Sequence, residues 1–205
     1  MGKVKIKPLL LITLIFFLFI GSIFILSPFP KQELLVVDLP NSFNIPINTG
    51  FEFQGKNQCA AFSTAFILRN FGQIAKGSEV YSELSYKVPI SGYVLPKGIV
   101  TYLRYNGFNS TVFKGDLNTL KAKLVEGSNP LIVLVGNGFL WQHYMTFVGF
   151  DNQKGELYFF DSGKDKDENA ELPGNRTMTN DYFLKWWDNG LPMFNHMYIT
   201  AEKTL

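Results

Sequence analysis

Residues 57–72 read NQCAAFSTAFILRNFG and contain Cys59, the only cysteine of the 205-residue chain. Alanine, phenylalanine and leucine dominate this stretch, which predicts a helix that begins near Gln58. Gly72 suits the position just after a helix, so we expect the helix to end at Phe71. A cysteine at the start of a helix suits nucleophilic chemistry. Burial in a core is the competing interpretation, since free cysteines are often buried.

Three more helices are predicted from residues that favour helix termini. Ser78 and Asp116 are good N-caps, and Pro96 suits a first helical turn. Gly107 and Gly127 are expected to follow the ends of the last two of these helices.

The second half of the chain has mainly the pattern of strands. Runs rich in β-branched and aromatic residues predict strands at 130–136, 143–150, 156–160 and 197–203. A turn-forming segment joins the second of these strands to the third, DNQKG at 151–155. A helical pattern returns at 177–190, with Thr179 as its N-cap. Helices first and antiparallel strands later predict one α+β domain.

The N-terminal segment differs from this domain in composition. Three lysines precede an uninterrupted apolar run from Leu9 to Leu26. Eighteen helical residues span roughly 27 Å, close to the thickness of a bilayer core. No small-residue cleavage site follows, which favours an uncleaved transmembrane helix over a signal peptide. We therefore expect a single-pass cell-membrane protein with its domain outside the cytoplasm, or a secreted protein if the segment is cleaved.

These features divide the chain into three parts. Residues 1–27 are the predicted membrane anchor or signal peptide, and residues 28–40 are a predicted linker. The linker contains prolines and one strand-like stretch, ELLVVDL at 33–39. The compact domain is expected to occupy residues 41–205.

The charge of the chain gives no reason to expect nucleic acid as a partner. Three of the 19 basic residues lie in the first seven positions, so the remainder carries 16 basic and 17 acidic residues. This balance of −1 provides no positive field for a phosphate backbone. A single cysteine in an exported chain also excludes an internal disulfide.

His143 and Asp161 are the first candidates for partners of the cysteine. His143 enters an apolar strand and Asp161 ends the next one. A five-residue hairpin loop would place both side chains on one face of the sheet, one diagonal step apart. A four-residue loop would place them on opposite faces unless a β-bulge intervened. Each residue taken alone is as well explained by packing or by a turn.

Three other polar residues were weighed for the same site. His196, the only other histidine, precedes the last strand without a suitably spaced carboxylate, so we interpret it as structural or surface-exposed. Gln54 and Gln58 are candidate oxyanion donors beside the backbone N–H of Cys59. Gln58 adjoins Cys59 and its side chain should diverge from the thiol, whereas Gln54 lies in the preceding loop.

The order Gln54, Cys59, His143, Asp161 resembles that of papain-like cysteine peptidases. Within them the chain most resembles the bacteriocin-processing, double-glycine-leader peptidases, and the segment GIVTYLRYNGFNSTVFKGDLNTLKAKLVEGSNPLIVLVG supports this. The resemblance spans roughly residues 41–200, about one domain. It implies a papain-like fold in which a helical lobe with Cys59 packs on an antiparallel sheet with His143 and Asp161. It also implies thiol catalysis without a metal ion or organic cofactor.

The resemblance implies a role for each residue of the candidate site. Cys59 would be the nucleophile and should then be partly exposed, His143 would be the general base and acid, and Asp161 would orient the imidazole. Gln54 would line the oxyanion hole with the Cys59 amide. The expected function is hydrolysis of a peptide or protein substrate by a membrane-anchored enzyme. Transpeptidase or amidase chemistry with the same triad, and a non-catalytic papain-like binding module, are the alternatives.

Three tryptophans complete the candidates. Trp141, two residues before His143, is equally well explained as cleft wall or as packing. Trp186 and Trp187 are consecutive in a predicted helix, where one of two neighbours usually faces the core. Core packing is therefore the simpler expectation for that pair.

Overall fold

The computed structural model describes residues 8–26, 30–47, 49–138, 140–164 and 173–204. Its helices are α1 (Pro8–Leu26), α2 (Cys59–Asn70), α3 (Gly77–Glu83), α4 (Pro96–Tyr105), α5 (Leu117–Gly127) and α6 (Asn180–Trp187). Its strands are β1 (Lys31–Gln32), β2 (Ser42–Asn44), β3 (Phe108–Lys114), β4 (Leu131–Asn137), β5 (Trp141–Asp151), β6 (Glu156–Phe160), β7 (Arg176–Thr179) and β8 (Met197–Lys203). Elements of both kinds belong to one body, as the α+β prediction requires.

The eight strands form one sheet in the order β1-β3-β8-β4-β5-β6-β7, with β2 paired to β5. Every pair is antiparallel except the short parallel pair of β1 and β3. β5 is the longest strand and pairs with β4, β6 and β2. The strand that carries His143 is therefore fixed by neighbours on both of its edges.

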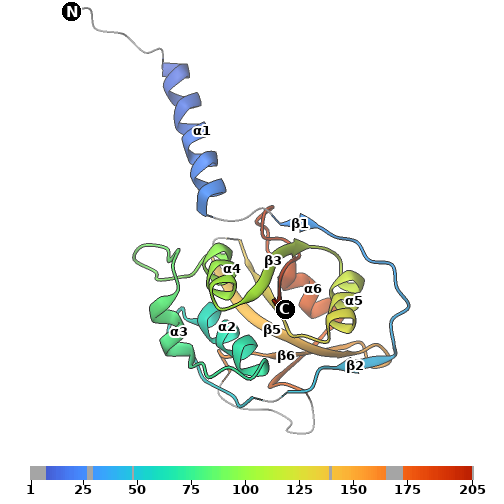
Figure 1. Cartoon of the computed structure of the whole chain (residues 1–205). Coiled ribbons are helices and arrows are strands. Elements are labelled where there is room, and N and C mark those ends of the chain that lie inside the picture. The colour runs from blue at the N-terminus through green and yellow to red at the C-terminus, as the bar shows by residue number, and fades with distance from the viewer. Residues whose placement is uncertain (1–7, 27–29, 48, 139, 165–172, 205) are drawn as a thin grey trace, which may run out of the picture.

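Two helical layers cover the sheet. Helices α2, α3 and α4 lie on one side, and α5 and α6 lie on the other (Figure 1). Residues of β4 alternate between the two cores: Ile132 and Leu134 pack with α2 and α4, whereas Val133 and Val135 pack with α5 and α6. Burial on both faces explains why this strand has a continuous apolar sequence.

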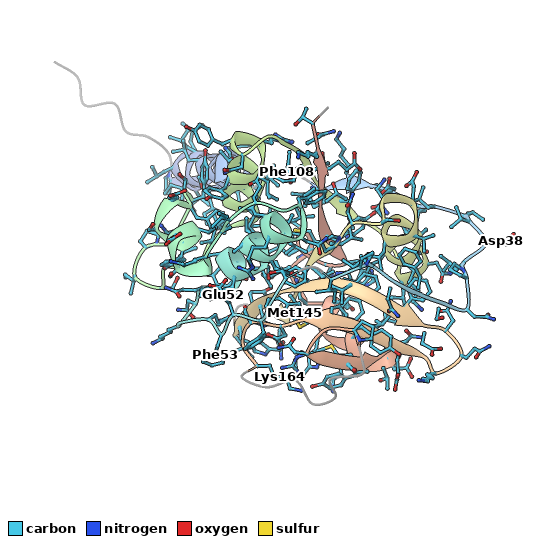
Figure 2. The ribbon with its side chains drawn as sticks, turned by 60° about the horizontal axis from the view of Figure 1, so that its bottom comes forward. Asp38, Glu52, Phe53, Phe108, Met145 and Lys164 are labelled. Carbon is cyan, nitrogen blue, oxygen red and sulfur yellow. The ribbon has the colours of Figure 1, made fainter. Side chains whose placement is uncertain are left out.

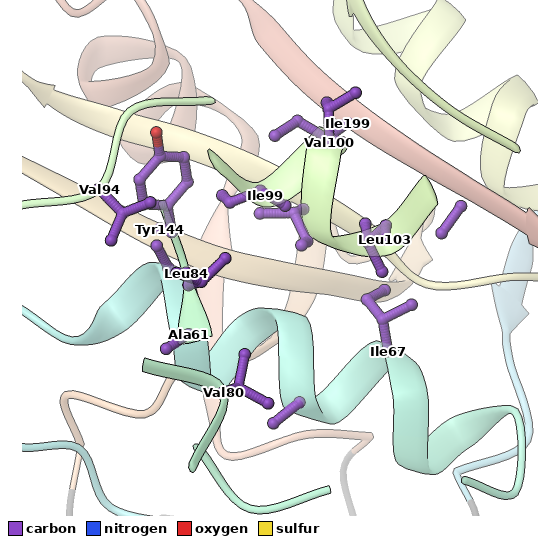
Figure 3. Close-up of a cluster of buried hydrophobic side chains, with 14 of the residues drawn as sticks. Ala61, Ile67, Val80, Leu84, Val94, Ile99, Val100, Leu103, Tyr144 and Ile199 are labelled. Atoms are coloured by element: carbon purple, nitrogen blue, oxygen red, sulfur yellow. The ribbon is translucent and has the colours of Figure 1, made fainter. Parts of the chain in front are cut away.

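Helix α2 is the most deeply buried helix among the described residues. Its first ten residues, 59–68, are all buried. Figure 3 shows Ile67 of α2 facing Leu103 of α4, and Ala61 of the same helix close to Leu84. The helix ends as predicted, with Gly72 in the left-handed region at φ 82°. Burial on all sides fixes the position of Cys59 at its first turn.

The predicted helix caps are partly confirmed. Asp116 accepts a hydrogen bond from the Thr119 N–H at 2.7 Å, and Thr179 accepts one from the Tyr182 N–H at 3.3 Å. Pro96 is the first residue of α4, as predicted. These three side chains use only local contacts, which is why the sequence identified them.

Two terminal residues were predicted incorrectly. Ser78 lies inside α3, because the carboxylate of Glu52 accepts the N–H of Gly77 and replaces a local cap. Gly127 is the last residue of α5, and Ser128 adopts the left-handed conformation at φ 48° instead. A cap supplied by a distant loop leaves no local pattern in the sequence.

The strand predicted at 33–39 is absent, because the residues that pair with β3 lie just before this range. Lys31 and Gln32 pair with β3, and Glu33 continues with its N–H donating to the Lys114 carbonyl at 2.9 Å. The carboxylate of Glu33 also contacts Lys123 at 3.2 Å and accepts from the Tyr198 hydroxyl at 2.5 Å. Part of the predicted linker is thus bound to the sheet.

Helix α1 stands apart from the rest of the structure in Figure 1. Among the residues that the structure describes, no helix has the length and apolar character needed to cross a membrane.

A β-bulge interrupts the hairpin of β5 and β6. Asp151 pairs with Glu156 and Gly149 with Tyr158, but the next pair is Phe147 with Phe159. The loop therefore has four residues, and Val148 is the extra residue, which is the second of the two cases that the sequence left open. This bulge reverses the face change that a four-residue loop would cause, so His143 and Asp161 still meet.

Replacing Gly149 with alanine is expected to destabilise the protein by about 1–3 kcal/mol. A Cβ atom there would lie 1.9 Å from the Asn44 Oδ1 and 2.9 Å from the Phe43 carbonyl oxygen, so β2 would have to move. Urea unfolding measures the loss. Gly50→Ala is the matched control, since its Cβ would meet nothing within 4 Å. Equal stability of both variants would contradict the expectation.

Candidate active site

Cys59 is the first residue of α2 and is only 2% exposed. We expected a partly exposed thiol, and that expectation is wrong. Asn57 donates to the Ser91 carbonyl at 2.8 Å and thereby connects the loop after α3 to the loop before the helix. A reaction at Cys59 would require a local movement that exposes its side chain.

His143 lies near the start of β5 and contacts Asp161, which follows β6 directly. The Nε2 of His143 lies 2.7 Å from Oδ1 of Asp161. An ionised carboxylate only accepts hydrogen bonds, so Nε2 is the donor. This leaves Nδ1 as the ring nitrogen available to the Cys59 thiol, whose interaction with the imidazole helps to raise the pKa of His143.

Asp161 is buried and fully engaged. Its Oδ1 also accepts the Gly163 N–H at 2.8 Å, and its Oδ2 accepts from Nε of Arg176 on β7. The side chain of Asn175 holds the backbone of the same residue, accepting from its N–H at 2.7 Å and donating to its carbonyl at 2.8 Å. The carboxylate consequently has one orientation, with Oδ1 aimed at the imidazole.

The electrostatics of the pair favour the charged forms. Burial lowers the pKa of His143, but hydrogen bonds and charge attraction to Asp161 and Cys59 outweigh it and raise that pKa to about 10. Burial raises the pKa of Asp161, but its contacts with His143, Arg176 and the Gly163 amide lower that pKa to about 2. A protonated imidazole facing an ionised carboxylate is therefore the resting state at neutral pH.

These shifts predict opposite effects of pH on stability. Because the folded-state pKa of His143 lies above its ordinary 6.5, the stabilisation is complete below pH 6.5 and is lost toward pH 10. The reverse holds for Asp161, whose stabilisation is lost as pH falls from 3.8 toward 2. Urea unfolding of the wild type and His143→Gln should show a stability difference that shrinks between pH 6.5 and 10. A difference that stays constant over this range would contradict the assignment.

The two candidate glutamines differ clearly in their contacts. Gln58 turns back onto its own loop, with Oε1 accepting the Gly55 N–H at 3.1 Å. Gln54 is held to the segment after Asp161: its N–H donates to the Ser162 carbonyl at 2.9 Å, and its Oε1 accepts from the Ser162 hydroxyl at 2.7 Å. The Oε1 atom of Gln54 is thus fixed, and Gln54 is the candidate of the two that is not bound to its own loop.

The same contact joins two parts of the chain that are distant in sequence. Figure 2 shows Phe53, in the loop before α2, near Lys164, in the segment after Asp161. The Gln54–Ser162 hydrogen bonds connect these segments directly. The loop that precedes the thiol and the segment that carries the carboxylate are thereby held in one arrangement.

His196 does not belong to this site. Its ring stacks on Trp187 at 4.9 Å between centroids, and partial burial lowers its pKa. Its backbone has φ 53°, so it occupies a tight turn before β8. The structural interpretation of this histidine is confirmed.

The tryptophans of α6 agree with the prediction that one of two consecutive residues faces the core. Trp187 is fully buried, and its Nε1 donates to the Met197 carbonyl at 2.9 Å. Trp186 is partly buried, packs against the edge of the same core and contacts Trp141, with ring centroids 4.9 Å apart.

Four residues near the site were not singled out from the sequence. Arg176 and Asn175 form hydrogen bonds with Asp161. The rings of Tyr93 and Tyr144 stack on each other, with 5.7 Å between their centroids. Burial and the charge of Cys59 raise the pKa of both tyrosines. Arg176 and Asn175 follow Asp161 by about fifteen positions, and this separation in sequence does not indicate that they contact Asp161. Only Tyr144, adjacent to His143, had a recognisable position in the sequence.

Comparisons of the sequence with protein-family profiles and with curated proteins find no match. Solved structures do match the fold. The peptidase domain of Streptococcus ComA, a bi-functional ABC transporter involved in quorum sensing, superposes with a TM-score of 0.56 at 19% identity. The match covers 75% of this chain and 97% of that domain.

Two further structures agree with this result. A double glycine motif protease from an AMS/PCAT transporter, solved with its leader peptide, has a TM-score of 0.53 at 14% identity, covering 78% of this chain and 94% of that one. Xylellain, a cysteine protease from Xylella fastidiosa, has a TM-score of 0.57 at 12% identity, covering 86% and 96%. The predicted papain-like α+β fold is confirmed.

Proposed function

We propose that this protein is a cysteine peptidase in which Cys59 attacks the substrate and His143 transfers the protons. The observation that carries the proposal is the imidazole of His143 held by the Asp161 carboxylate at 2.7 Å, with an interaction between the same ring and Cys59 that helps to raise its pKa. A thiol, an imidazole and an orienting acid are the parts that acyl transfer needs. The fold, shared with the cysteine proteases above, agrees with it.

The proposed reaction has two steps, acylation of Cys59 and hydrolysis of the resulting thioester. The Cys59 thiolate attacks the carbonyl carbon of the scissile bond, and the oxyanion accepts hydrogen bonds from the Cys59 N–H and the Gln54 amide. His143 gives its proton to the leaving amine, which departs and leaves a thioester. Water then loses a proton to His143 and attacks the thioester carbon, which releases the acid and restores the thiolate.

Peptides are the proposed substrate class. The double glycine motif protease with the same fold was solved with a leader peptide bound. A substrate peptide fits the chemistry of the proposed site, because the oxyanion donors and the imidazole address an amide bond and its leaving amine.

The cellular location is a separate part of the proposal and rests on the sequence alone. The lysines and apolar residues within 1–27 are the support for a membrane-attached enzyme that acts outside the cytoplasm. Fractionation of the full chain tests this part. Recovery in the membrane after an alkaline wash supports attachment, whereas recovery in the supernatant as the uncleaved chain overturns it.

Alkylation of Cys59 by iodoacetamide tests the catalytic proposal without a known substrate. At pH 6 the wild type is expected to label at least about tenfold faster than His143→Ala, because the imidazolium stabilises the reactive thiolate. Mass spectrometry of the peptide containing Cys59 measures the rate. His196→Ala is the matched control and should label like the wild type. Equal rates in the wild type and His143→Ala would overturn the proposal.

A further inference from the structure

Three aromatic side chains contact one another where the start of β5, which carries His143, meets α6. Trp141 of β5 lies 4.9 Å from Trp186 of α6, and Tyr182 of the same helix lies 6.2 Å from Trp186, measured between ring centroids. Trp141 is 41% exposed and Tyr182 is 50% exposed, whereas Trp186 between them is partly buried against the core. We refer to these three residues as the aromatic ledge. Exposed apolar side chains that adjoin one another offer a surface on which a ligand can bind.

The ledge is held rigidly. Helix α6 begins at the Thr179 cap and is anchored by Trp187, whose indole N–H donates to the Met197 carbonyl at 2.9 Å. Asn189 lies two residues after the end of α6, and its side chain donates to the Gln142 side chain at 3.4 Å. This contact links α6 to the start of β5. Binding on a fixed aromatic surface loses little conformational entropy.

The ledge continues the face of the sheet that carries His143. Trp141 and His143 are two apart on β5, so their side chains project to the same side, roughly 7 Å apart. Asp161 is bonded to Nε2 of the imidazole. The ledge extends from His143 back along β5 to Trp141 and from there to Trp186 of α6.

The chemistry of the proposed reaction assigns one half of the substrate to this side. His143 must protonate the leaving amine, so the residues after the scissile bond pass beside its ring. An extended peptide advances about 3.3 Å per residue, so a distance of roughly 7 Å corresponds to the second residue past the bond. Aromatic faces favour apolar and aromatic side chains at that place.

We propose that the aromatic ledge is a specificity subsite for an apolar side chain at the second or third residue after the scissile bond. This inference rests on the proposed peptidase function and names the substrate class more closely. The occupant is a peptide segment on the leaving-group side, with leucine, phenylalanine or a similar residue against Trp186 and Trp141.

Partition of the acyl-enzyme tests the subsite without knowledge of the natural cleavage sequence. A peptide thioester that lacks any leaving-group peptide acylates Cys59, and water competes with an added dipeptide amide for the thioester. The amine attacks the thioester carbon, His143 takes its proton, and the Cys59 thiolate departs. Gly-Phe-amide and Gly-Leu-amide are expected to give about three to ten times more aminolysis product than Gly-Ala-amide or Gly-Asp-amide.

Variants of the ledge identify its contribution. Trp186→Ala and Trp141→Ala should remove the preference for Gly-Phe-amide and leave hydrolysis of the thioester within about twofold of the wild type. Trp186→Phe should retain most of the preference. Tyr105→Ala, which removes a 90% exposed tyrosine on α4, is the matched surface control. Thermal unfolding by circular dichroism confirms that each variant is folded.

The outcomes separate the inference from the function on which it rests. If the thioester is not hydrolysed and Cys59 is not acylated, the peptidase proposal fails. If hydrolysis proceeds but the wild type shows no preference among the dipeptide amides, the subsite is overturned and the peptidase proposal stands. A preference that survives both alanine substitutions also overturns the assignment to the ledge.

Discussion

Replacing Cys59 with serine is expected to lower kcat/KM for peptide hydrolysis by about 10⁴-fold or more. A hydroxyl is a far weaker nucleophile than a thiolate at neutral pH, and the imidazolium beside it has no anion to activate. The substitution keeps a small side chain at a buried position, so the fold should persist. Hydrolysis of the best peptide found by library screening measures the loss.

Ser63→Ala is the matched control for this experiment. Ser63 lies one turn further along α2, is equally buried, and has a hydroxyl without a hydrogen-bond partner among the described residues. Its removal should leave hydrolysis unchanged within about twofold. Comparable activity of Cys59→Ser and Ser63→Ala would mean that the thiol is a packing residue, as the competing interpretation of the sequence holds.

Replacing Asp161 with asparagine is expected to lower kcat by about 10²-fold to 10⁴-fold with little change in KM. Arg176 can only donate to position 161, so the amide oxygen of an asparagine would face Arg176. Its NH₂ group would then face Nε2 of His143 and force the ring proton onto Nδ1. A ring protonated at Nδ1 cannot accept the thiol proton, which accounts for the loss.

The pH profile distinguishes this tautomer effect from simple loss of structure. Without the carboxylate, the pKa of His143 falls from about 10, so the alkaline limit of activity should move to lower pH in Asp161→Asn. Arg176→Gln keeps the carboxylate and serves as the control, with a much smaller decrease in kcat. Equal losses in both variants, without a shift of the alkaline limit, would contradict this role of Asp161.

The residues of the candidate site were predictable because each lies in a strong local pattern. Cys59 starts a helix between a polar loop and an apolar run, and His143 and Asp161 lie on two strands joined by one short hairpin. The contact between them depended on a register that the sequence left open. The bulge at Val148 decided it, and the adjacent Gly149 was a local signal for a bulge that leaves its exact position open.

The parts that the sequence did not predict depend on distant neighbours. Strand β3 was not predicted, since FNSTVFK alternates weakly and becomes a strand by pairing with β8 along seven residues. The cap of α3 comes from Glu52, and the clamp on Asp161 comes from Arg176 on β7. In each case the stabilising partner is remote in sequence, so local propensity carries no information about it.

The burial of Cys59 also bears on how fast its thiol would be lost to oxidation. A cysteine residue that is 2% exposed can react with peroxide or with a substrate only when a local movement exposes it. A small population of the exposed form lowers the rates of both reactions by the same factor. The proposed enzyme would then be oxidised to sulfenic and sulfinic acids slowly in an oxidising medium, and bound substrate would shield the thiol further. Its working lifetime would be set by how often Cys59 becomes exposed.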